Sequence, residues 1–328
     1  MKDNTICGKC KYHRTDKDGD WYCANPDSDY YTDWTEYNDG CEDGEERKER
    51  IMLGQLNIYG EDKVQVAIKR LKTFEPPEGY HLAFSGGKDS VVIKALADMA
   101  GVKYDAHYTL TSVDPPELVQ FVKTFDDVSI DKPRDKDGKQ ITMWNLIPQK
   151  KMPPTRIVRY CCKELKEQQS QGRFTITGVR KAESVKRAKR GGLELAEKKS
   201  QYAERFDPDN PDQELIHICH NYARKILNPI IDWTTEEVWE FIHAYNIPYC
   251  KLYDEGFTRL GCIGCPFGGE KGMKKEFERY PKYRQMYVRA FERMIKARGD
   301  RGSADWKTGE DVMDWWMNGG TRQMEEVW

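Results

Sequence analysis

Apolar residues in this chain fall into short runs that are separated by glycine-rich or charged segments. Some runs have the 3.6-residue spacing of a helix that is buried on one side, and others are continuous stretches bounded by turn residues, as in buried strands. Because strands and helices alternate along the chain, the pattern predicts an α/β fold with a mostly parallel, doubly wound sheet. Helices are predicted over residues 64–71, 91–99, 181–199, 234–245 and 274–298, and strands over 81–84, 103–110, 174–179 and 215–218.

The C-terminal part of the chain is predicted to be helical. Val312, Trp315 and Trp316 have the spacing of one apolar helix face, which we expect to pack on the body of the protein. Stacking of aromatic residues such as Trp316 on nucleic-acid bases is the alternative.

The 328 residues carry a net charge of −2, but the charges are segregated along the chain. Residues 1–50 hold fourteen acidic and eight basic side chains, whereas residues 150–199 hold fifteen basic and five acidic ones. The basic segment is expected to attract anions, which leaves open a nucleic-acid backbone, a nucleotide or a well-solvated helix. No apolar run approaches the roughly 18 to 20 residues that span a bilayer, and nothing at the N-terminus resembles a signal peptide. We therefore expect a soluble, cytoplasmic protein with reduced thiols and no membrane partner.

The run Ser85-Gly86-Gly87-Lys88-Asp89-Ser90 lies between a predicted strand and a predicted helix. The glycine pair allows a sharp turn and a close approach of the backbone to an anion, and the amides that follow lie at a helix N-terminus. The Lys88 ammonium and the hydroxyls of Ser85 and Ser90 add hydrogen-bond donors. The run is shorter than the loop of ordinary nucleoside triphosphatases. It resembles the PP-loop of ATP pyrophosphatases, which cleave ATP between the α and β phosphates, and a glycine turn with a solvated lysine is the alternative.

Ten cysteines include two CxxC pairs, a pattern that indicates metal binding in a chain without secretory features. Four of them lie in the acidic N-terminal segment, among few large aliphatic residues, and match the ligand count of a closed structural zinc site. We therefore predict a zinc module with a structural or partner-binding role, and an iron–sulfur cluster or a metal-free extension is the alternative. The predicted ligands are Cys7, Cys10, Cys23 and Cys41.

Five motifs in the middle of the chain together resemble the phosphoadenylylsulfate reductase family of the PP-loop superfamily. They are SGGKDS at 85–90, RYCCKELK at 159–166, TGVRxxESxxR at 177–187, NPIIDW at 228–233 and GCIGCP at 261–266. The resemblance implies a PP-loop α/β fold and a 4Fe–4S cluster held by an adjacent cysteine pair and a CxxC, since four thiolates are the usual complement of such a cluster. Zinc is the alternative occupant. In this chain the ligands would be Cys161, Cys162, Cys262 and Cys265.

The family contains at least two chemistries. Its sulfonucleotide reductases attack an adenylylated sulfate with a cysteine near the C-terminus and usually carry a degraded loop, whereas here no cysteine follows Cys265 and the loop is intact. The resemblance is therefore closest to members that consume ATP, such as the iron–sulfur enzyme of DNA phosphorothioation and the iron–sulfur tRNA thiolases. It implies that an acceptor is adenylylated, with release of pyrophosphate, in a sulfur transfer. The acceptor would be DNA or tRNA, and a partner protein would donate sulfur or electrons.

Two other functions are compatible with the sequence. The first is reduction of adenylylsulfate or phosphoadenylylsulfate to sulfite, with an external thiol, Cys219 or Cys250 as the nucleophile. Both cysteines are nevertheless expected to be packed core thiols. The second is a non-enzymatic iron–sulfur nucleotide sensor or assembly subunit, which the N-terminal module would suit.

The expected site residues come from the loop and from the resemblance. Lys88, Asp89 and Arg180 are predicted to be catalytic, and Mg²⁺ would bridge the phosphates of ATP, with Asp89 as a ligand or as an organiser of the loop. Asp114 is predicted to contact the ribose or Mg²⁺, and its alternative role is to cap a helix. Predicted nucleotide contacts are Ser85, Gly86, Gly87, Lys88, Asp89, Ser90, Asp114, Gly178 and Arg180, and predicted contacts to phosphate or to an anionic acceptor are Arg156, Arg159 and Arg187. The predicted domains are a metal module at 1–50, the nucleotide-binding α/β domain at 51–233, and a helical region at 234–328 that completes the cluster site.

Overall fold

The computed structural model describes residues 5–6, 12–15, 21–35, 40–42, 61–166, 172–196, 204–209, 224–299 and 306–318. The chain divides into two compact units. One comprises residues 1–62 with His243–Tyr245, and the other comprises Lys63–Ile242 and Asn246–Trp328.

The first unit contains two short antiparallel strand pairs. β1 (Thr5–Ile6) pairs with β4 (Gly40–Cys41), and β2 (His13–Thr15) pairs with β3 (Trp21–Cys23). Cys23 is buried, and the Ser28 hydroxyl donates to Sγ of Cys41 at 3.5 Å. Cys7 and Cys10 lie outside the described residues, so the zinc module stays a prediction.

A seven-stranded sheet forms the centre of the second unit, in the order β10-β9-β11-β8-β5-β6-β7. The five strands from β11 to β7 run parallel, and β9 and β10 extend the sheet in antiparallel fashion. A mostly parallel sheet with helices between its strands confirms the predicted α/β fold class. The strands are β5 (Tyr80–Ala83), β6 (Tyr104–Thr109), β7 (Val128–Asp131), β8 (Phe174–Ile176), β9 (Leu193–Ala196), β10 (Glu204–Phe206) and β11 (Arg224–Leu227).

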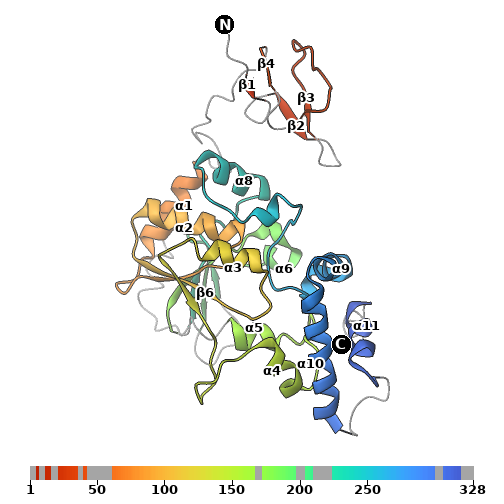
Figure 1. The fold of residues 1–328 in the computed structure, drawn as a ribbon. Coiled ribbons are helices and arrows are strands. Elements are labelled where there is room, and N and C mark those ends of the chain that lie inside the picture. The colour runs from red at the N-terminus through yellow and green to blue at the C-terminus, as the bar shows by residue number, and fades with distance from the viewer. Residues whose placement is uncertain are drawn as a thin grey trace. The chain divides into compact units, whose positions relative to one another are not determined.

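Helices connect these strands and form most of the C-terminal part of the chain (Figure 1). α1 packs against α2, and apolar side chains such as Leu71, Leu82 and Leu96 are fully buried. None of the described helices is long and apolar enough to cross a membrane. The helices are α1 (Lys63–Thr73), α2 (Lys88–Ala100), α3 (Pro116–Val122), α4 (Met143–Lys150), α5 (Tyr160–Leu165), α6 (Val185–Ala188), α8 (Thr235–Ala244), α9 (Gly269–Arg279), α10 (Pro281–Arg298) and α11 (Gly309–Met317).

α10 packs against both α4 and α11, and the three helices share one apolar core (Figure 1). Trp316 of α11 is 1 % exposed and its ring contacts those of Tyr287 and Phe291. Its indole N–H donates to the carbonyl of Pro154 at 2.7 Å. The predicted apolar helix face is confirmed, and the burial of Trp316 excludes the alternative that this ring stacks on bases.

The prediction of a single helix over residues 181–199 is wrong. A 3₁₀ turn at Lys181–Glu183 and the short helix α6 end before the pair Gly191-Gly192, and β9 follows. Glycine is a poor helix former, and the leucines beyond it alternate as in a strand, with Leu193 and Leu195 fully buried next to β11. Residues 181–190 therefore form two short helical turns on the surface that lead into β9.

The predicted helix over residues 274–298 consists of two helices. α9 ends at Arg279 and α10 begins at Pro281. Proline lacks the N–H group of a helix interior and clashes with the preceding turn, but it fits the first turn of a helix. The break turns the chain so that Phe277 of α9 packs against Tyr287 of α10, with ring centroids 5.8 Å apart.

Candidate functional site

Two glycines shape the turn between β5 and α2. Gly86 has a φ of 72°, and a Cβ at this position would lie 2.7 Å from Cδ1 of Leu118 in α3. Conformation and space therefore both require glycine here. Gly87 is the N-cap of α2, and its carbonyl oxygen accepts a hydrogen bond from the Ser90 hydroxyl at 2.8 Å. The turn leads directly into the amino end of a helix, where N–H groups and the helix dipole favour a phosphate.

Lys88, Asp89 and Arg180 form a continuous chain of ion pairs at this helix end. Nζ of Lys88 lies 2.9 Å from Oδ2 of Asp89, and Nε of Arg180 lies 2.6 Å from Oδ1 of the same carboxylate. The Arg180 side chain is 1 % exposed and that of Asp89 is 20 % exposed. The structure thus brings the three predicted catalytic residues together. Each carboxylate oxygen of Asp89 thus contacts one cationic side chain, an arrangement in which Asp89 organises the loop.

Further contacts fix Arg180 in place. Its Nη1 donates to the carbonyl oxygen of Trp233 at 3.3 Å and to the hydroxyl of Thr235 at 3.4 Å. Two residues before it, Gly178 lies so close to α2 that a Cβ there would be 2.9 Å from Cβ of Asp89. The carboxyl ends of β5 and β8 meet at one edge of the sheet, and this close packing locks the segment after β8 onto the first turn of α2.

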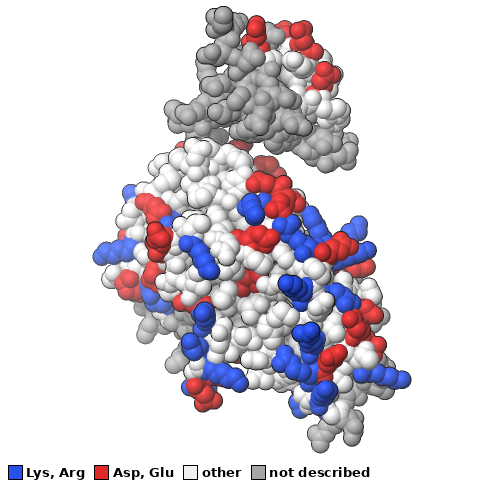
Figure 2. Space-filling model, in the orientation of Figure 1, with Lys and Arg blue, Asp and Glu red and all other residues white. Residues whose placement is uncertain are grey.

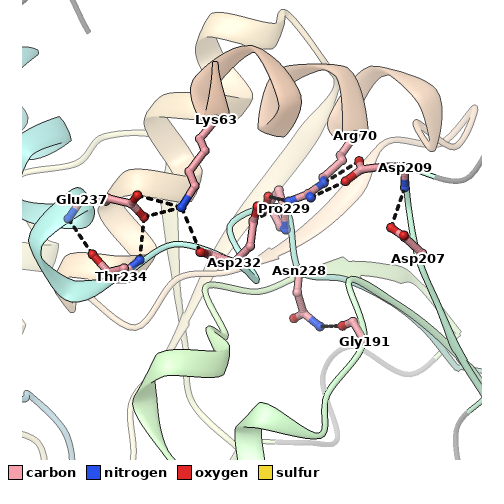
Figure 3. A network of polar contacts seen from close by, with 10 residues as sticks. All are labelled: Lys63, Arg70, Gly191, Asp207, Asp209, Asn228, Pro229, Asp232, Thr234 and Glu237. Carbon is pink, nitrogen blue, oxygen red and sulfur yellow. Dashed lines mark hydrogen bonds and ion pairs between the residues drawn. The ribbon is translucent and has the colours of Figure 1, made fainter. Parts of the chain in front are cut away.

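A buried ionic network supports the segment after β11 that contacts Arg180 (Figure 3). Arg70 of α1 is 5 % exposed, and its Nη1 donates to Oδ1 of Asp232 at 2.8 Å and to the carbonyl of Pro229 at 2.7 Å. Its Nε donates to Oδ1 of Asp209 at 2.8 Å. Burial lowers the pKa of Arg70, but the hydrogen bonds and charges of the two aspartates outweigh this effect and raise it. The network ties the segment to α1 and so holds its contacts to Arg180 in position.

Tyr253 contacts the amino end of α2. It ends the 3₁₀ turn Lys251–Tyr253, and its phenolic oxygen accepts a hydrogen bond from the backbone N–H of Lys88 at 2.9 Å. Its ring packs edge-on against Trp239 and Tyr249. Burial is the largest cause that raises the pKa of Tyr253, so the hydroxyl is neutral. The contact uses an N–H group that a phosphate at this helix end would need.

Two of the predicted anion-binding arginines lie beside the cysteines. Nε of Arg156 donates to the carbonyl oxygen of Pro266 at 3.3 Å. Nη2 of Arg159 lies 3.5 Å from Sγ of Cys162, and its guanidinium lies over the ring of Phe267 at 5.0 Å. Arg159 therefore places positive charge next to a thiol group, and Arg156 contacts the residue that follows Cys265.

Local contacts engage two other predicted residues. Asp114 is 6 % exposed and accepts the backbone N–H of Thr111 at 2.6 Å and its hydroxyl at 2.9 Å. Asp114 thus organises the turn after β6. Arg187 pairs with Glu183 within the exposed turn after β8, and its side chain is 45 % exposed. Neither contact excludes a role toward a substrate.

The two cysteine pairs converge beside the apolar core of α4, α10 and α11. Cys161 and Cys162 lie in the first turn of α5, and Cys262 and Cys265 flank a tight turn. A hydrogen bond from the Cys161 thiol, together with Arg159, lowers the pKa of Cys162 to about 5. The same hydrogen bond raises the pKa of Cys161, with burial and the charges of Cys162, Cys262 and Cys265 as further causes. The four thiols are thus close enough to influence one another.

Gly264 shapes the turn between Cys262 and Cys265. It has a φ of 72°, and a Cβ there would lie 2.5 Å from the ring of Phe277. Its N–H donates to Oε2 of Glu276 at 2.6 Å, and burial raises the pKa of that carboxyl to about 7. The turn is therefore built by contacts within the protein.

The four thiols match the usual ligand set of an iron–sulfur cluster and also that of a structural zinc site. Four thiolates bound to zinc at about 2.3 Å would lie about 3.8 Å apart. In the part of the chain that the structure describes, three ligand atoms come within 4.8 Å of one another only in a group of histidine and aspartate side chains. No three of the four cysteine sulfurs therefore lie within 4.8 Å of one another in this structure. Four cysteine thiolates are the usual complement of a 4Fe–4S cluster.

The sequence reasoning missed three contributors to this site. Lys166 lies close enough to Cys262 that the charge of this cysteine is the largest cause that raises the pKa of Lys166. Lys166 lies four residues after Cys162, one helical turn away, and this spacing was the available signal. Tyr253 and Arg70 reach their partners across 165 and 162 positions, and no local pattern indicates such contacts.

Fold and site together define a nucleotide-utilising enzyme of the PP-loop type. The glycine turn, the lysine at the helix end and the mostly parallel sheet are its defining features. The chain belongs to the family of the phosphoadenosine phosphosulfate reductase domain, whose model matches residues 79–267. The matched region is more than half of the chain and extends from β5 through both cysteine pairs.

Individual relatives match stretches of different length. An uncharacterised protein of Methanocaldococcus jannaschii is 29 % identical over 221 residues, which are 64 % of this chain and 47 % of that protein. Adenosine 5'-phosphosulfate reductase of Salinibacter ruber is 25 % identical over 143 residues, 42 % of this chain and 43 % of the reductase. The chain thus spans less than half the length of these relatives. A crystal structure of phosphoadenylyl-sulfate reductase from Candida auris, a phosphate complex, matches with a TM-score of 0.39 and 15 % identity over 61 % of this chain and 87 % of that one.

Proposed function

We propose that this protein uses ATP to adenylylate an acceptor and releases pyrophosphate, as one step of a sulfur transfer. The observation that carries the proposal is the intact loop, in which Lys88 begins α2 and Asp89 holds Lys88 and Arg180 together. In a sulfonucleotide the sulfate is already adenylylated, so there is no pyrophosphate to release. A lysine in this position is therefore better suited to ATP than to a sulfonucleotide.

In this reaction the phosphates of ATP lie at the amino end of α2. An oxygen of the acceptor attacks the α-phosphorus, the bond from that phosphorus to the oxygen that bridges to the β-phosphate breaks, and pyrophosphate leaves with the electron pair. Lys88 and the N–H groups of the loop stabilise the negative charge that develops on the leaving group. Asp89 and Arg180 act as positioning residues, because they hold Lys88 through the ion pairs described above. Mg²⁺ would accompany the nucleotide.

The surface charge favours a nucleic acid as the acceptor. Figure 2 shows Lys and Arg side chains, with Asp and Glu side chains among them, on the side of the molecule where α6 and α9 lie. Lys271, Lys274 and Lys275 of α9 and Arg187 of α6 are exposed. Such a surface attracts a phosphodiester backbone through its charge, whatever the base sequence. The attacking oxygen would belong to DNA or tRNA.

The cysteine site would take part in the sulfur transfer. Cys161, Cys162, Cys262 and Cys265 would hold a 4Fe–4S cluster, which supplies a place where sulfur or an electron can reside. Arg159 and Lys166 lie beside these thiols and favour their ionised form. Sulfur or reducing equivalents would come from a partner protein.

The test is anaerobic incubation of the full chain with ATP, adenylylsulfate or phosphoadenylylsulfate, followed by assays for pyrophosphate and sulfite. We expect pyrophosphate from ATP, more of it with DNA or tRNA, and none from Lys88→Ala. The exposed Lys72→Ala on α1 is the matched control and should retain wild-type activity. Pyrophosphate release that survives Lys88→Ala would overturn the proposal.

A second candidate function rests on the name of one relative described above, the adenosine 5'-phosphosulfate reductase of Salinibacter ruber. Sulfite from adenylylsulfate, with no pyrophosphate from ATP, would establish that reaction. Cys250 is poorly suited as its nucleophile, because the thiol is 1 % exposed and burial raises its pKa. Cys219 lies outside the described residues.

A further inference from the structure

One face of the central sheet carries a polar group that the proposed function does not use. Strand register and the alternation of side chains place His81 of β5, Asp105 and His107 of β6 and Asp131 of β7 on this face. His81 is buried, whereas the other three side chains are half-buried and accessible to water. The group belongs to none of the motifs that form the loop or the cysteine site.

Two imidazoles and one carboxylate converge within this group. One nitrogen of His81, one nitrogen of His107 and one oxygen of Asp105 all lie within 4.8 Å of one another. Oδ2 of Asp105 lies 2.5 Å from Nε2 of His107 and 3.9 Å from Nδ1 of His81. Ligands bound to zinc at roughly 2.0–2.2 Å lie about 3.3–3.6 Å apart, and the observed separations bracket this range.

Two further residues orient the donor atoms. Oδ2 of Asp131 lies 2.7 Å from Nδ1 of His107, so Nε2 of that ring faces Asp105. Nη2 of Arg173 lies 2.5 Å from Oδ1 of Asp105, and its Nη1 donates at 3.5 Å to Oδ2, the oxygen that faces the histidines. Metal-bound histidines usually donate their second N–H to a carboxylate, and metal-bound carboxylates are in turn hydrogen-bonded.

We propose that His81, Asp105 and His107 bind a divalent transition-metal ion, with Asp131 and Arg173 as supporting residues. Two histidines and one carboxylate form the ligand set of zinc and non-haem iron sites that keep an open coordination position. The partial exposure of the group gives the ion an entry path and gives water access to that position. The site is independent of the proposed adenylylation, since it uses none of the same residues.

The test is Co²⁺ binding to the full chain, purified anaerobically and then freed of loosely bound metal by dialysis against a chelator. Equilibrium dialysis counts the bound ions, and visible absorption reports their ligands. We expect the wild-type protein to bind one Co²⁺ more per chain than His107→Gln. The additional ion should show weak d–d bands without the intense sulfur-to-cobalt absorption of thiolate sites, because its ligands are nitrogen and oxygen.

Two variants complete the test. His243→Gln changes an exposed histidine of α8 and should keep the additional ion. Asp131→Asn leaves all three ligands in place and should weaken the site about 10- to 100-fold, which keeps the proposal testable if His107→Gln fails to fold. Equal Co²⁺ binding by the wild-type protein, His107→Gln and Asp131→Asn would overturn the proposal. The group would then be His107 hydrogen-bonded to the carboxylates of Asp105 and Asp131 without a metal ion.

Discussion

The phenolic oxygen of Tyr253 accepts the backbone N–H of Lys88 at 2.9 Å, although the two residues are 165 positions apart. This N–H belongs to the first residue of α2, where a bound phosphate needs donors. Nucleotide binding must therefore exchange one hydrogen bond for another, and a typical hydrogen bond is worth about 0.5–1.5 kcal/mol. We expect Tyr253→Phe to bind α,β-methylene-ATP roughly 2- to 10-fold more tightly, as measured by isothermal titration calorimetry.

Tyr249→Phe is the matched control for this measurement. Tyr249 belongs to the same aromatic group, and its hydroxyl donates to Asp254 at 3.0 Å. Removal of this hydroxyl should leave the affinity for the nucleotide unchanged. Weaker binding by Tyr253→Phe would show that its hydroxyl contacts the phosphate, and the competition described above would then be wrong.

Removal of the Asp89 carboxylate should destabilise the folded protein as well as the loop. Arg180 is 1 % exposed, so Asp89→Ala leaves a buried guanidinium without its ion pair. Loss of one partner of a buried pair costs roughly 3–5 kcal/mol, and the partial exposure of Asp89 favours the lower end. Urea unfolding measures this loss. Glu310→Ala breaks the exposed pair with Arg284 and should cost less than about 1 kcal/mol. Similar losses in both variants would contradict the burial argument.

Gly178→Ala tests the close packing of the segment after β8 on α2. The added Cβ would lie 2.9 Å from the carbonyl carbon and oxygen of Asp89, so the two segments must separate. Overpacking of this kind costs roughly 1–3 kcal/mol, and nucleotide affinity should fall with it. Gly272→Ala in α9 meets nothing within 4 Å and should instead stabilise the helix by up to about 1 kcal/mol. Thermal unfolding and nucleotide titration compare the two, and an unchanged Gly178→Ala protein would show that this packing is unimportant.

The local part of the site could be predicted because its residues are contiguous. Residues 85–90 contain the turn, the lysine and the start of the helix, and the strand and helix that flank them carry clear apolar patterns. Arg180 could also be predicted as a residue of this site, because adjacent parallel strands end at the same edge of a sheet. The contact between Asp89 and Arg180 follows from that topology.

Other features could not be predicted because they depend on contacts between distant segments. The pairing of Arg70 with Asp232 and the contact of Tyr253 with α2 have no local pattern. β9 was missed for a different reason. Its apolar alternation is short and lies in a strongly basic segment, and such charges favour the prediction of an exposed helix. The pairing of β9 with β11 is a contact between distant segments that the local pattern does not contain.

The buried carboxyl of Glu276 should make the stability of the metal-free protein depend on pH. Its pKa is raised from 4.5 to about 7, mainly by burial, so the folded state holds the proton more tightly than the unfolded chain does. The resulting stabilisation is complete below about pH 4.5 and is lost as the pH rises through 7, with a full size of about 3 kcal/mol. Glu276→Gln keeps an acceptor for the N–H of Gly264 and should be more stable than wild type at about pH 8 but similar at about pH 5.

Urea unfolding at a series of pH values measures this effect. Glu278→Gln lies on the same helix at an exposed position and should reproduce the wild-type profile. If Glu276→Gln also follows the wild-type profile, another group controls the pH dependence.

Cys262→Ala should prevent assembly of the iron–sulfur cluster. Its sulfur lies 3.5 Å from the hydroxyl of Thr111, and its charge is one of the causes that raise the pKa of Cys161 in the first cysteine pair. The substitution leaves three thiols, and we expect iron and acid-labile sulfide to fall to a small fraction of the wild-type content in anaerobically purified protein. Chemical assays for both elements make the comparison, and circular dichroism shows whether the variant is folded.

Cys250→Ala is the control for Cys262→Ala, because it removes a cysteine that is not a predicted ligand of the cluster. This thiol is 1 % exposed and packs with Leu118 and Leu252, so its replacement should cost stability but spare the iron. Joint substitution of Cys7 and Cys10 should remove zinc and also spare the iron, and loss of both metals would mean that the two sites depend on each other. If Cys262→Ala keeps its full iron content, Cys262 is not a ligand and the assignment of this cluster to the two cysteine pairs fails.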